Sequence, residues 1–416
     1  NLTVYLNSIK VGTLQRYRSQ SFRFSYDESW LKYDKAVPIS RSLPLQKEHF
    51  PEKKSRAFFA GILPEQKQRE IIAGILRTGE HNEFRMLEKL GGECAGAVML
   101  HPDGVTPQQI KQQSFQELSD KELSKIINEL PSRPLLAGRA GLRLSLAGAQ
   151  DKLPVVYTNN KFCLPLYDTP STHIIKPEPD LFPGLAMNEV FCMKLAKISG
   201  LKVANVEYLL IGDKPCILVE RYDRIQKENN TTIRIHQEDF CQALGINPEN
   251  KYQSDGGPSL KQCISLFRDW SSVPAIDISE FINVIIFNVL IGNADAHGKN
   301  FSFLYRKNTR SLAPYYDLVS TIAWPELSGN LAMKVGSSKS VNVFGIGEWR
   351  KMATACNLGW PMVRQRIKDL SELIATKVKN VQITADDEIN KKIHTLKEVI
   401  VTRANRMLDA LSSQDI

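Results

Sequence analysis

Short segments in which apolar and polar residues alternate open the chain. They predict three strands, at Leu2–Leu6, Lys10–Leu14 and Ser21–Tyr26. A stretch with helical spacing follows, and Gly91-Gly92 ends it after Leu90. The polar run from Asp103 to Gln116 predicts a linker, and Ser119-x-x-Glu122 is a capping box for a helix that runs to Leu130. This first region contains no catalytic constellation, so we interpret it as a scaffold or docking module.

The pattern becomes rich in strands between about Leu135 and Ile235. The predicted strands are Lys152–Tyr157, Lys161–Leu166, Thr172–Lys176, Val206–Ile211 and Cys216–Arg221. Asn159-Asn160 and Gly212-Asp213 have the composition of two tight hairpin turns. Between the strands, Leu185–Ile198 predicts an amphipathic helix that Ser199-Gly200 ends.

Helical spacing dominates from Gln237 to the end of the chain. Residues 281–291 are apolar on nearly all sides and predict a buried helix, capped by Asp277 and Glu280. That apolar run is too short to cross a bilayer. The apolar positions of 363–374 and 393–411 recur at helical spacing, and core packing is their expected role.

These patterns predict three regions: residues 1–131, 132–235 and 236–416. The middle region has the order loop, strand, strand ending in Lys, helix and two strands, which is that of a kinase small lobe. The expected fold class is therefore α+β, a two-lobed protein-kinase-like fold with an added N-terminal α/β subdomain and a mostly helical C-terminal lobe. A chain of 416 residues is long enough for several cores.

The net charge of +9, from 54 basic and 45 acidic residues, suits contact with nucleic acid or with an acidic protein. A solvated basic surface explains the same excess, and no basic run is dense enough to define a patch. The seven cysteines are scattered and form no Cys-x-x-Cys pair, so neither a disulfide framework nor a zinc site is indicated. No secretory segment opens the sequence, and a cytoplasmic protein without a membrane partner is expected.

The segment Asn293–Asn300 has the layout of a kinase catalytic loop. Phosphoryl transfer needs an Asp beside the attacking hydroxyl, an Asn on a magnesium ion and a second Asp that bridges the metal to the phosphates. Asp295, Asn300 and Asp317 fit these roles in that order, because Asp-x-x-x-x-Asn is the spacing of such loops. A short hairpin formed by residues 301–316 would bring Asp317 beside Asn300.

Further candidates follow from their places in this order of elements. Lys176 ends a strand thirteen residues before Glu189, and this pair would hold a nucleotide's phosphates while Glu189 positions the ammonium. The strand end Val219–Arg224 would offer backbone to an adenine edge, with Asp223 near the ribose. Either motif alone is also compatible with ordinary surface charge.

The small residues of Ser145–Lys152 stand where a phosphate-binding loop belongs, although the segment matches neither standard glycine-rich motif. By itself such a loop is more often a plain turn. His297 has no second His or Cys at ligand spacing, so ordering of the catalytic loop is favoured over zinc binding. Lys299 would lie near the transferred phosphate.

Six motifs together resemble the HipA family of bacterial serine/threonine kinase toxins. They are Ser145–Lys152, Thr172–Lys176, Val219–Arg224, Ser254–Pro258, Asp295–Asn300 and Tyr316-Asp317. The resemblance implies ATP and Mg²⁺ as cofactors, and glutamyl-tRNA synthetase is the family's best-known target. It also implies a HipB-like helix-turn-helix antitoxin, operator DNA bound mainly through that antitoxin, and autophosphorylation of Ser145.

Carried over to this sequence, the resemblance implies catalytic roles for Asp295 and Lys299 and metal binding by Asn300 and Asp317. The implied nucleotide contacts are Ala147, Gly148, Ala149, Gln150, Asp151, Lys152, Lys176, Glu220, Arg221, Tyr222, Asp223, His297, Gly298, Lys299, Asn300, Tyr316 and Asp317.

One segment departs from the family pattern. Met352–Trp360 has no basic residue where a family member offers them to DNA, which leaves Lys334, Lys339, Arg350 and Lys351 as nearby candidates only. Two rival functions stay open: a catalytically silent nucleotide-binding corepressor that acts with its antitoxin, and a small-molecule or lipid kinase. The intact acidic and lysine set argues against the first rival, and the Ser145 loop argues against the second.

Overall fold

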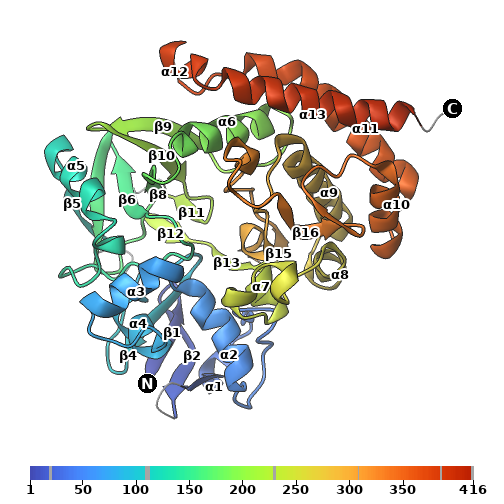
Figure 1. Ribbon diagram of the computed structural model, residues 1–416. Coiled ribbons are helices and arrows are strands. Elements are labelled where there is room, and N and C mark those ends of the chain that lie inside the picture. The colour runs from blue at the N-terminus through green and yellow to red at the C-terminus, as the bar shows by residue number, and fades with distance from the viewer. Residues whose placement is uncertain (18–20, 108–112, 228–230, 308, 385–386, 414–416) are drawn as a thin grey trace. The chain divides into compact units, whose positions relative to one another are not determined.

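The computed structural model describes residues 1–17, 21–107, 113–227, 231–307, 309–384 and 387–413. The chain forms two compact units (Figure 1). Unit 1 comprises Asn1–Pro179, Leu209–Glu249 and Leu304–Asn308, and unit 2 comprises Asp180–Tyr208, Asn250–Phe303 and Thr309–Ile416. The division into three regions stays a prediction, and each unit is described by itself below.

Unit 1 begins with an antiparallel sheet in the order β3-β2-β1-β4. Its strands are β1 (Leu2–Leu6), β2 (Ile9–Arg16), β3 (Phe22–Tyr26) and β4 (Val98–Pro102), and its helices are α1 (Glu28–Leu31), α2 (Glu52–Phe59), α3 (Gln66–Ile75) and α4 (Glu83–Leu90). Side chains such as Val4, Phe24 and Phe59 are fully buried in one apolar core. The three predicted strands and the helix end at Leu90 are confirmed.

The second sheet of unit 1 has the order β5-β7-β6-β8-β10-β9. Its strands are β5 (Ser114–Glu117), β6 (Leu153–Thr158), β7 (Lys161–Leu166), β8 (His173–Pro177), β9 (Val206–Ile211), whose start belongs to unit 2, and β10 (Lys214–Glu220). The five predicted strands and both hairpin turns are confirmed within a residue or two. Helix α5 (Asp120–Glu129) begins at Ser119 with the predicted capping box.

The predicted linker from Asp103 to Gln116 is wrong in its last part, because β5 pairs with β7 along the sheet edge. Its side chains are exposed or half-buried, the apolar Phe115 included, so the segment shows no alternation of buried apolar and exposed polar residues, and backbone pairing with β7 defines the strand. Residues 108–112 of this segment lie outside the described residues. The remaining elements of unit 1 are β11 (Arg224–Gln226), β12 (Thr232–Arg234), β13 (His236–Asp239) and α7 (Phe240–Leu244).

Unit 2 is mainly helical, as predicted for most of the C-terminal region. Its helices are α6 (Leu185–Ile198), α8 (Leu260–Trp270), α9 (Pro274–Ile291), α10 (Ile346–Ala355), α11 (Trp360–Lys377), α12 (Asp387–Lys391) and α13 (His394–Ser412). The short strands are β14 (Ser302–Arg306), whose end belongs to unit 1, β15 (Thr309–Leu312), β16 (Asn330–Val335) and β17 (Ser338–Ser340). Helices α11 and α13 pack along each other, and both contact α9 (Figure 1).

Two details of the helix predictions are wrong. Helix α9 begins after Val273 with Pro274 at its first position, so Asp277 and Glu280 lie inside the helix and do not cap it. Asp277 instead accepts hydrogen bonds from the Ser271 hydroxyl (2.6 Å) and the Leu312 N–H (2.9 Å). Helix α6 has the predicted bounds but is buried on most sides, so it is a core helix and not an amphipathic one.

Helix α9 is longer than the predicted segment, and by length and composition alone its 18 residues could cross a membrane. However, 67% of it is buried inside the fold, as in the core helix of a globular protein.

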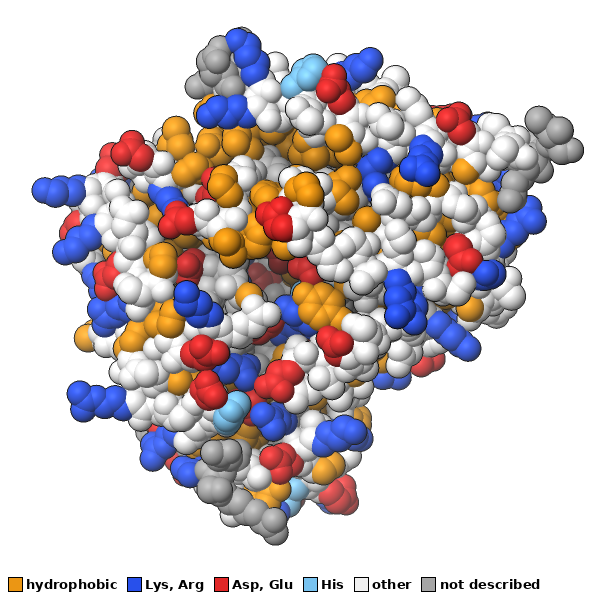
Figure 2. All heavy atoms as spheres, viewed as in Figure 1, with side chains coloured by type: hydrophobic (Ala, Val, Ile, Leu, Met, Phe, Trp, Pro, Cys, Tyr) orange, Lys and Arg blue, Asp and Glu red, His pale blue; other side chains and the backbone are white. Residues whose placement is uncertain are grey.

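On the face shown in Figure 2, basic side chains are interspersed with acidic ones. This face therefore presents no large field of a single sign.

Candidate active site

The predicted catalytic loop, residues 293–300, starts in unit 2 where α9 ends. Gly292 closes the helix with a positive φ of 74°, a conformation that glycine adopts without strain. The loop then leads into β14, and the hairpin of β14 and β15 returns the chain to Asp317. The Asn300 amide nitrogen lies 3.5 Å from an Asp317 carboxylate oxygen. The predicted juxtaposition of Asn300 and Asp317 is confirmed.

Asp317 has a left-handed backbone conformation, with φ at 55°. Residues other than glycine seldom adopt it, and such strain persists where the surrounding structure fixes it. Two contacts from the α6 region fix this segment. Asn188 on α6 makes a pair of hydrogen bonds with the Ser320 backbone (3.1 and 2.8 Å), and the Tyr315 N–H donates to the Lys202 carbonyl (2.8 Å).

The side chain and the backbone of Asp295 are both held. The Tyr252 hydroxyl donates to the Asp295 carboxylate at 2.8 Å, and the Asn293 side-chain oxygen accepts from the Asp295 N–H at 3.0 Å. The Tyr252 ring lies edge-on against His297, with 5.3 Å between ring centres. Sequence reasoning missed Tyr252, because it stands 43 residues before Asp295 and belongs to no spacing motif.

His297 and Lys299 are both buried within the loop. The His297 N–H donates to the Asn300 side-chain oxygen (3.0 Å), which closes a tight turn over Gly298. The Tyr316 hydroxyl donates to the Lys299 carbonyl (2.7 Å). The backbone of His297 thus forms part of the loop's turn, and Tyr316, the residue before Asp317, is tied to the loop through Lys299.

The oxygen donors of this site fit a magnesium ion. Asn300 and Asp317 bring an amide and a carboxylate together, and Mg²⁺ is usually held by one or two carboxylates plus the phosphates of a substrate. Among the described residues there is no group of three or more His, Cys, Asp and Glu side chains that could hold a metal ion. Asn300 and Asp317 would thus supply part of the magnesium ligands, and phosphate oxygens of a substrate would supply others.

In unit 1, the loop before β6 is closed on itself. The Ser145 hydroxyl is fully buried and donates to the Ile62 carbonyl (3.0 Å), while its N–H donates to the Glu93 carbonyl (2.8 Å). The Lys152 ammonium donates to the Ala147 carbonyl across Gly148, whose φ is 110°. These contacts hold the loop as a tight turn with Ser145 turned inward.

The loop also contacts helix α3. Gln68 on α3 donates to the Asp151 carboxylate at 2.9 Å. Burial raises the pKa of Asp151, and the hydrogen bond from Gln68 acts in the opposite direction. The Asp151 carboxylate is therefore partly shielded from water and is in contact with helix α3.

The remaining predicted nucleotide residues have different surroundings. Lys176 is buried near the end of β8, opposite Ile217 of β10, and the Tyr222 hydroxyl donates to the Gln237 side chain (2.5 Å). Glu220 is exposed at the end of β10. Glu189 is buried on α6, which belongs to unit 2, so its pairing with Lys176 stays a prediction.

Arg221 and Asp223 lie in an ion-pair network, and their predicted roles as nucleotide contacts stay predictions. Both are buried, and Arg221 donates to both carboxylate oxygens of Asp223, at 3.0 and 2.8 Å. Asp223 also accepts from the Gly96 N–H (2.7 Å) and pairs with Arg224 (3.0 Å). Both carboxylate oxygens of Asp223 are thus engaged in a buried ion-pair network.

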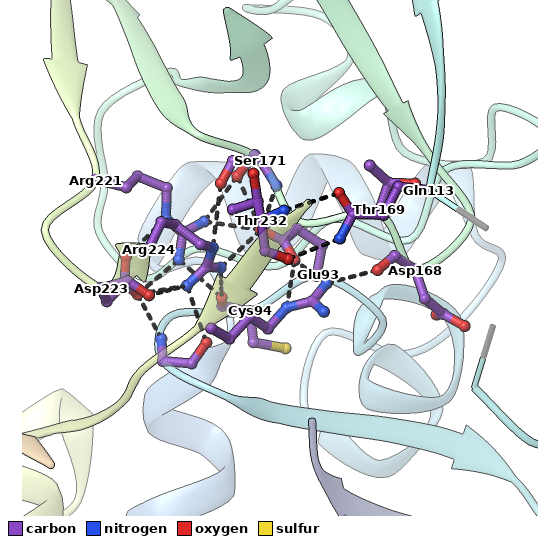
Figure 3. A network of polar contacts seen from close by, with 12 residues as sticks. Glu93, Cys94, Gln113, Asp168, Thr169, Ser171, Arg221, Asp223, Arg224 and Thr232 are labelled. Carbon is purple, nitrogen blue, oxygen red and sulfur yellow. Dashed lines mark hydrogen bonds and ion pairs between the residues drawn. The ribbon is translucent and has the colours of Figure 1, made fainter. Parts of the chain in front are cut away.

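The centre of that network is Glu93, whose side chain is fully buried (Figure 3). Its carboxylate pairs with Arg221 (3.1 Å), Arg224 (2.7 Å) and Arg234, and it accepts from the Ser171 hydroxyl (2.8 Å). Burial alone would raise the pKa of Glu93, but the three guanidinium groups hold it well below its usual value. The network joins the N-terminal part of unit 1 to the strands that carry the predicted nucleotide residues.

A different polar contact holds the helix behind the catalytic loop. Arg403 on α13 donates to the carbonyls of Val289 (2.7 Å) and Leu290 (3.2 Å), in the last turn of α9, and to that of Val341 (2.7 Å). Burial lowers the pKa of Arg403 to about 10, so the group stays charged at neutral pH. A cation at this end of a helix is stabilised by the helix dipole. No sequence motif pointed to Arg403.

Comparisons with known proteins agree with this geometry. The family model of the HipA N-terminal domain matches residues 2–101, and that of the HipA-like C-terminal domain matches residues 144–379. Y4mE of Sinorhizobium fredii, which is named as a candidate kinase, is 43% identical over 91% of this chain and 91% of its own length. The serine/threonine-protein kinase toxin HipA of Shewanella oneidensis is 30% identical over 80% of this chain and 78% of its own.

A solved structure of Shewanella oneidensis HipA, determined with HipB and operator DNA, matches the whole of both chains with a TM-score of 0.88 and 26% identity. The predicted fold class is confirmed by this match. The six sequence motifs, the two family models and these relatives all lead to the same assignment. The chain belongs to the HipA family of kinase-like toxins.

Proposed function

We propose that this protein is an ATP-dependent serine/threonine-protein kinase that transfers the γ-phosphoryl group of ATP to a serine of a protein substrate. The observation that carries the proposal is that one hairpin brings Asp317 beside Asn300, while Asp295 precedes Asn300 at the spacing of a kinase catalytic loop. Membership of the HipA family supports it.

In this proposal each residue has a defined task. Asp295 orients the substrate hydroxyl and accepts its proton, and Lys299 neutralises charge near the transferred group. Asn300 and Asp317 would hold magnesium, which supplies charge neutralisation at the phosphates. Catalysis then rests mainly on positioning, because the phosphoryl group needs little covalent help from the protein.

Residues of unit 1 would bind the nucleotide. Small side chains in the loop Ala147–Asp151 let backbone N–H groups approach phosphate oxygens, and Lys152 and Lys176 supply positive charge. Glu220 and Tyr222 would contact the adenine. The contact between Lys152 and the Ala147 carbonyl would have to open for this role, since it now occupies the ammonium.

Autophosphorylation of Ser145 is a further part of the proposal. Because the Ser145 hydroxyl is buried against the Ile62 carbonyl, the loop must leave its present position before the serine can react. A phosphoserine adds about −1.5 to −2 charges, which would prevent the loop from returning to that buried position and lower ATP affinity. Calorimetric ATP binding to homogeneous phosphorylated and unphosphorylated protein measures this effect.

We also infer a role as the toxin of a toxin–antitoxin pair in the cytoplasm. Its partner would be a HipB-like helix-turn-helix antitoxin that carries the contacts to operator DNA, by analogy with the Shewanella oneidensis complex, which contains HipA, HipB and operator DNA. Glutamyl-tRNA synthetase is the first protein substrate to test. Recovery of a small DNA-binding protein by co-purification from the native host would support this inference, whereas recovery of the chain alone would contradict it.

The decisive experiment measures phosphoryl transfer by Asp295→Asn and Asp317→Ala, with Asp369→Asn on the exposed face of α11 as the matched control. We expect Asp295→Asn to lose about 10²- to 10⁴-fold in rate, the range for removing a general base, with nucleotide affinity retained. Asp317→Ala should lose both activity and magnesium-dependent nucleotide affinity. Wild-type turnover in Asp295→Asn would refute the catalytic assignment, and nucleotide binding without any transfer by the wild type would favour the corepressor.

A further inference from the structure

The carboxylate of Asp295 has a hydrogen-bond donor that the catalytic motif does not include. Tyr252 lies in the segment before α8, and its hydroxyl donates to one Asp295 oxygen at 2.8 Å. The neighbouring Gly298 N–H donates to the Lys251 carbonyl, and the Tyr252 ring rests against His297. Residues 251 and 252 thus contact the loop at three points and fix one oxygen of the base.

The backbone of Asp295 is held by a chain of two side-chain amides. Asn288, buried in the last turn of α9, accepts from the Asn293 side-chain nitrogen at 2.9 Å, and the Asn293 N–H donates to the Asn288 carbonyl at 2.8 Å. The Asn293 side-chain oxygen then accepts from the Asp295 N–H at 3.0 Å. The Asn293 side chain thus uses its nitrogen toward Asn288 and its oxygen toward Asp295, so the two amides link helix α9 to Asp295.

These two sets of contacts act on the same group. A general base must lie within hydrogen-bond reach of the proton that it accepts, and small displacements of such a group lower the rate steeply. With one carboxylate oxygen bound by Tyr252 and the backbone bound by Asn293, the second oxygen keeps a fixed direction. We propose that Tyr252 and the Asn288–Asn293 pair are positioning residues that aim Asp295 at the substrate hydroxyl. This inference rests on the proposed kinase function.

The first test is Tyr252→Phe, which removes only the hydroxyl of a half-buried side chain. Its matched control is Tyr17→Phe, because the Tyr17 hydroxyl also donates to a carboxylate, that of Glu52, in the N-terminal part. We expect kcat of Tyr252→Phe to fall about 10-fold, with the KM for ATP and the Tm unchanged. Activity equal to that of the control, or higher than wild type, would overturn the positioning role.

The second test is a double-mutant cycle of Asn288→Ala and Asn293→Ala, with Asn283→Ala as the control. Asn283 lies on the same helix and accepts from Arg366 at 3.0 Å, so its loss perturbs α9 without contact with the loop. We expect each single variant to lower kcat about 10- to 100-fold, and the double variant to lower it no further than Asn293→Ala. Additive losses, or a loss in Asn283→Ala of the same size at equal Tm, would contradict the inference.

The two proposals fail in different ways. If the wild type transfers no phosphoryl group from magnesium ATP to any protein, the proposed function fails. If the wild type is active while Tyr252→Phe and Asn293→Ala both match their controls, only the positioning role fails.

Discussion

The two units fix their predicted site residues with different chemistry. In unit 1, a fully buried carboxylate, Glu93, is surrounded by Arg221, Arg224 and Arg234, and Asp223 adds a second negative charge. In unit 2, the catalytic loop is held by neutral amides, by the Tyr252 hydroxyl, and by a buried arginine that donates to backbone carbonyls.

The contrast follows from what each region must connect. The network in unit 1 joins chain segments more than 120 residues apart, and paired charges fix their mutual orientation through many donors and acceptors at once. Unit 2 must fix a loop at the end of an apolar helix, where the carbonyls of the last turn lack partners within the helix. The guanidinium group of Arg403 donates to several carbonyls at once. A buried ion pair depends on each partner, because removal of one leaves an uncompensated buried charge.

The largest effect should follow from Glu93→Gln. Loss of this charge leaves three buried guanidinium groups with Asp223 as their remaining carboxylate in the network, and breaking a buried ion pair is destabilising by about 3–5 kcal/mol. Thermal and urea unfolding of the purified protein measure it. Glu117→Gln is the control, since Glu117 pairs with Lys161 on the surface and should change the unfolding free energy by less than about 1 kcal/mol. A stable Glu93→Gln protein would contradict the central place of this network.

A smaller loss is expected for Arg403→Met, which keeps much of the side-chain length but leaves the carbonyls of Val289, Leu290 and Val341 without this donor. We expect a decrease of about 2–3 kcal/mol in the free energy of unfolding, typical of unsatisfied buried acceptors. Arg366→Met, which removes the hydrogen bond to Asn283, should lose less. Equal losses in both variants would show that the carbonyl contacts add nothing beyond ordinary packing.

The smallest expected effect concerns pH and two buried groups on β13. Burial raises the pKa of Glu238 to about 7, although it accepts from Ser40 and Tyr305, and burial lowers the pKa of His236 to about 4. The raised Glu238 pKa means that its stabilisation is present below about pH 4.5 and is lost as the pH rises to 7. The lowered His236 pKa has the opposite sign: its stabilisation is present above pH 6.5 and is lost as the pH falls to 4.

The two contributions nearly cancel between pH 5 and 7, so Glu238→Gln should expose the slope of His236. We expect the unfolding free energy of this variant to rise by on the order of 2 kcal/mol from pH 5 to 7 relative to wild type. Denaturant titrations at several pH values measure the slope. A variant whose pH dependence equals that of the wild type would rule out a titration of Glu238 in this range.

The sequence predicted the regular elements well where local patterns are strong. The hairpins at Asn159-Asn160 and Gly212-Asp213, the capping box at Ser119 and the helix Leu185–Ile198 all depend on neighbouring residues. It failed for the edge strand β5, which is defined by its pairing with β7, and for the start of α9, where Pro274 at the first helical position marks an earlier start than the predicted caps.

For the site, the short hairpin between Asn300 and Asp317 was enough to predict that these two residues lie side by side, since it leaves the chain few other paths. Sequence alone thus determined the fold class, the family and the juxtaposition of Asn300 and Asp317. Only the tertiary structure showed that Asp223 pairs with arginines, that Ser145 faces inward, and that Tyr252, Glu93 and Arg403 hold the two regions. These contacts join residues far apart in the chain, and no local spacing encodes which distant donor will reach a buried acceptor.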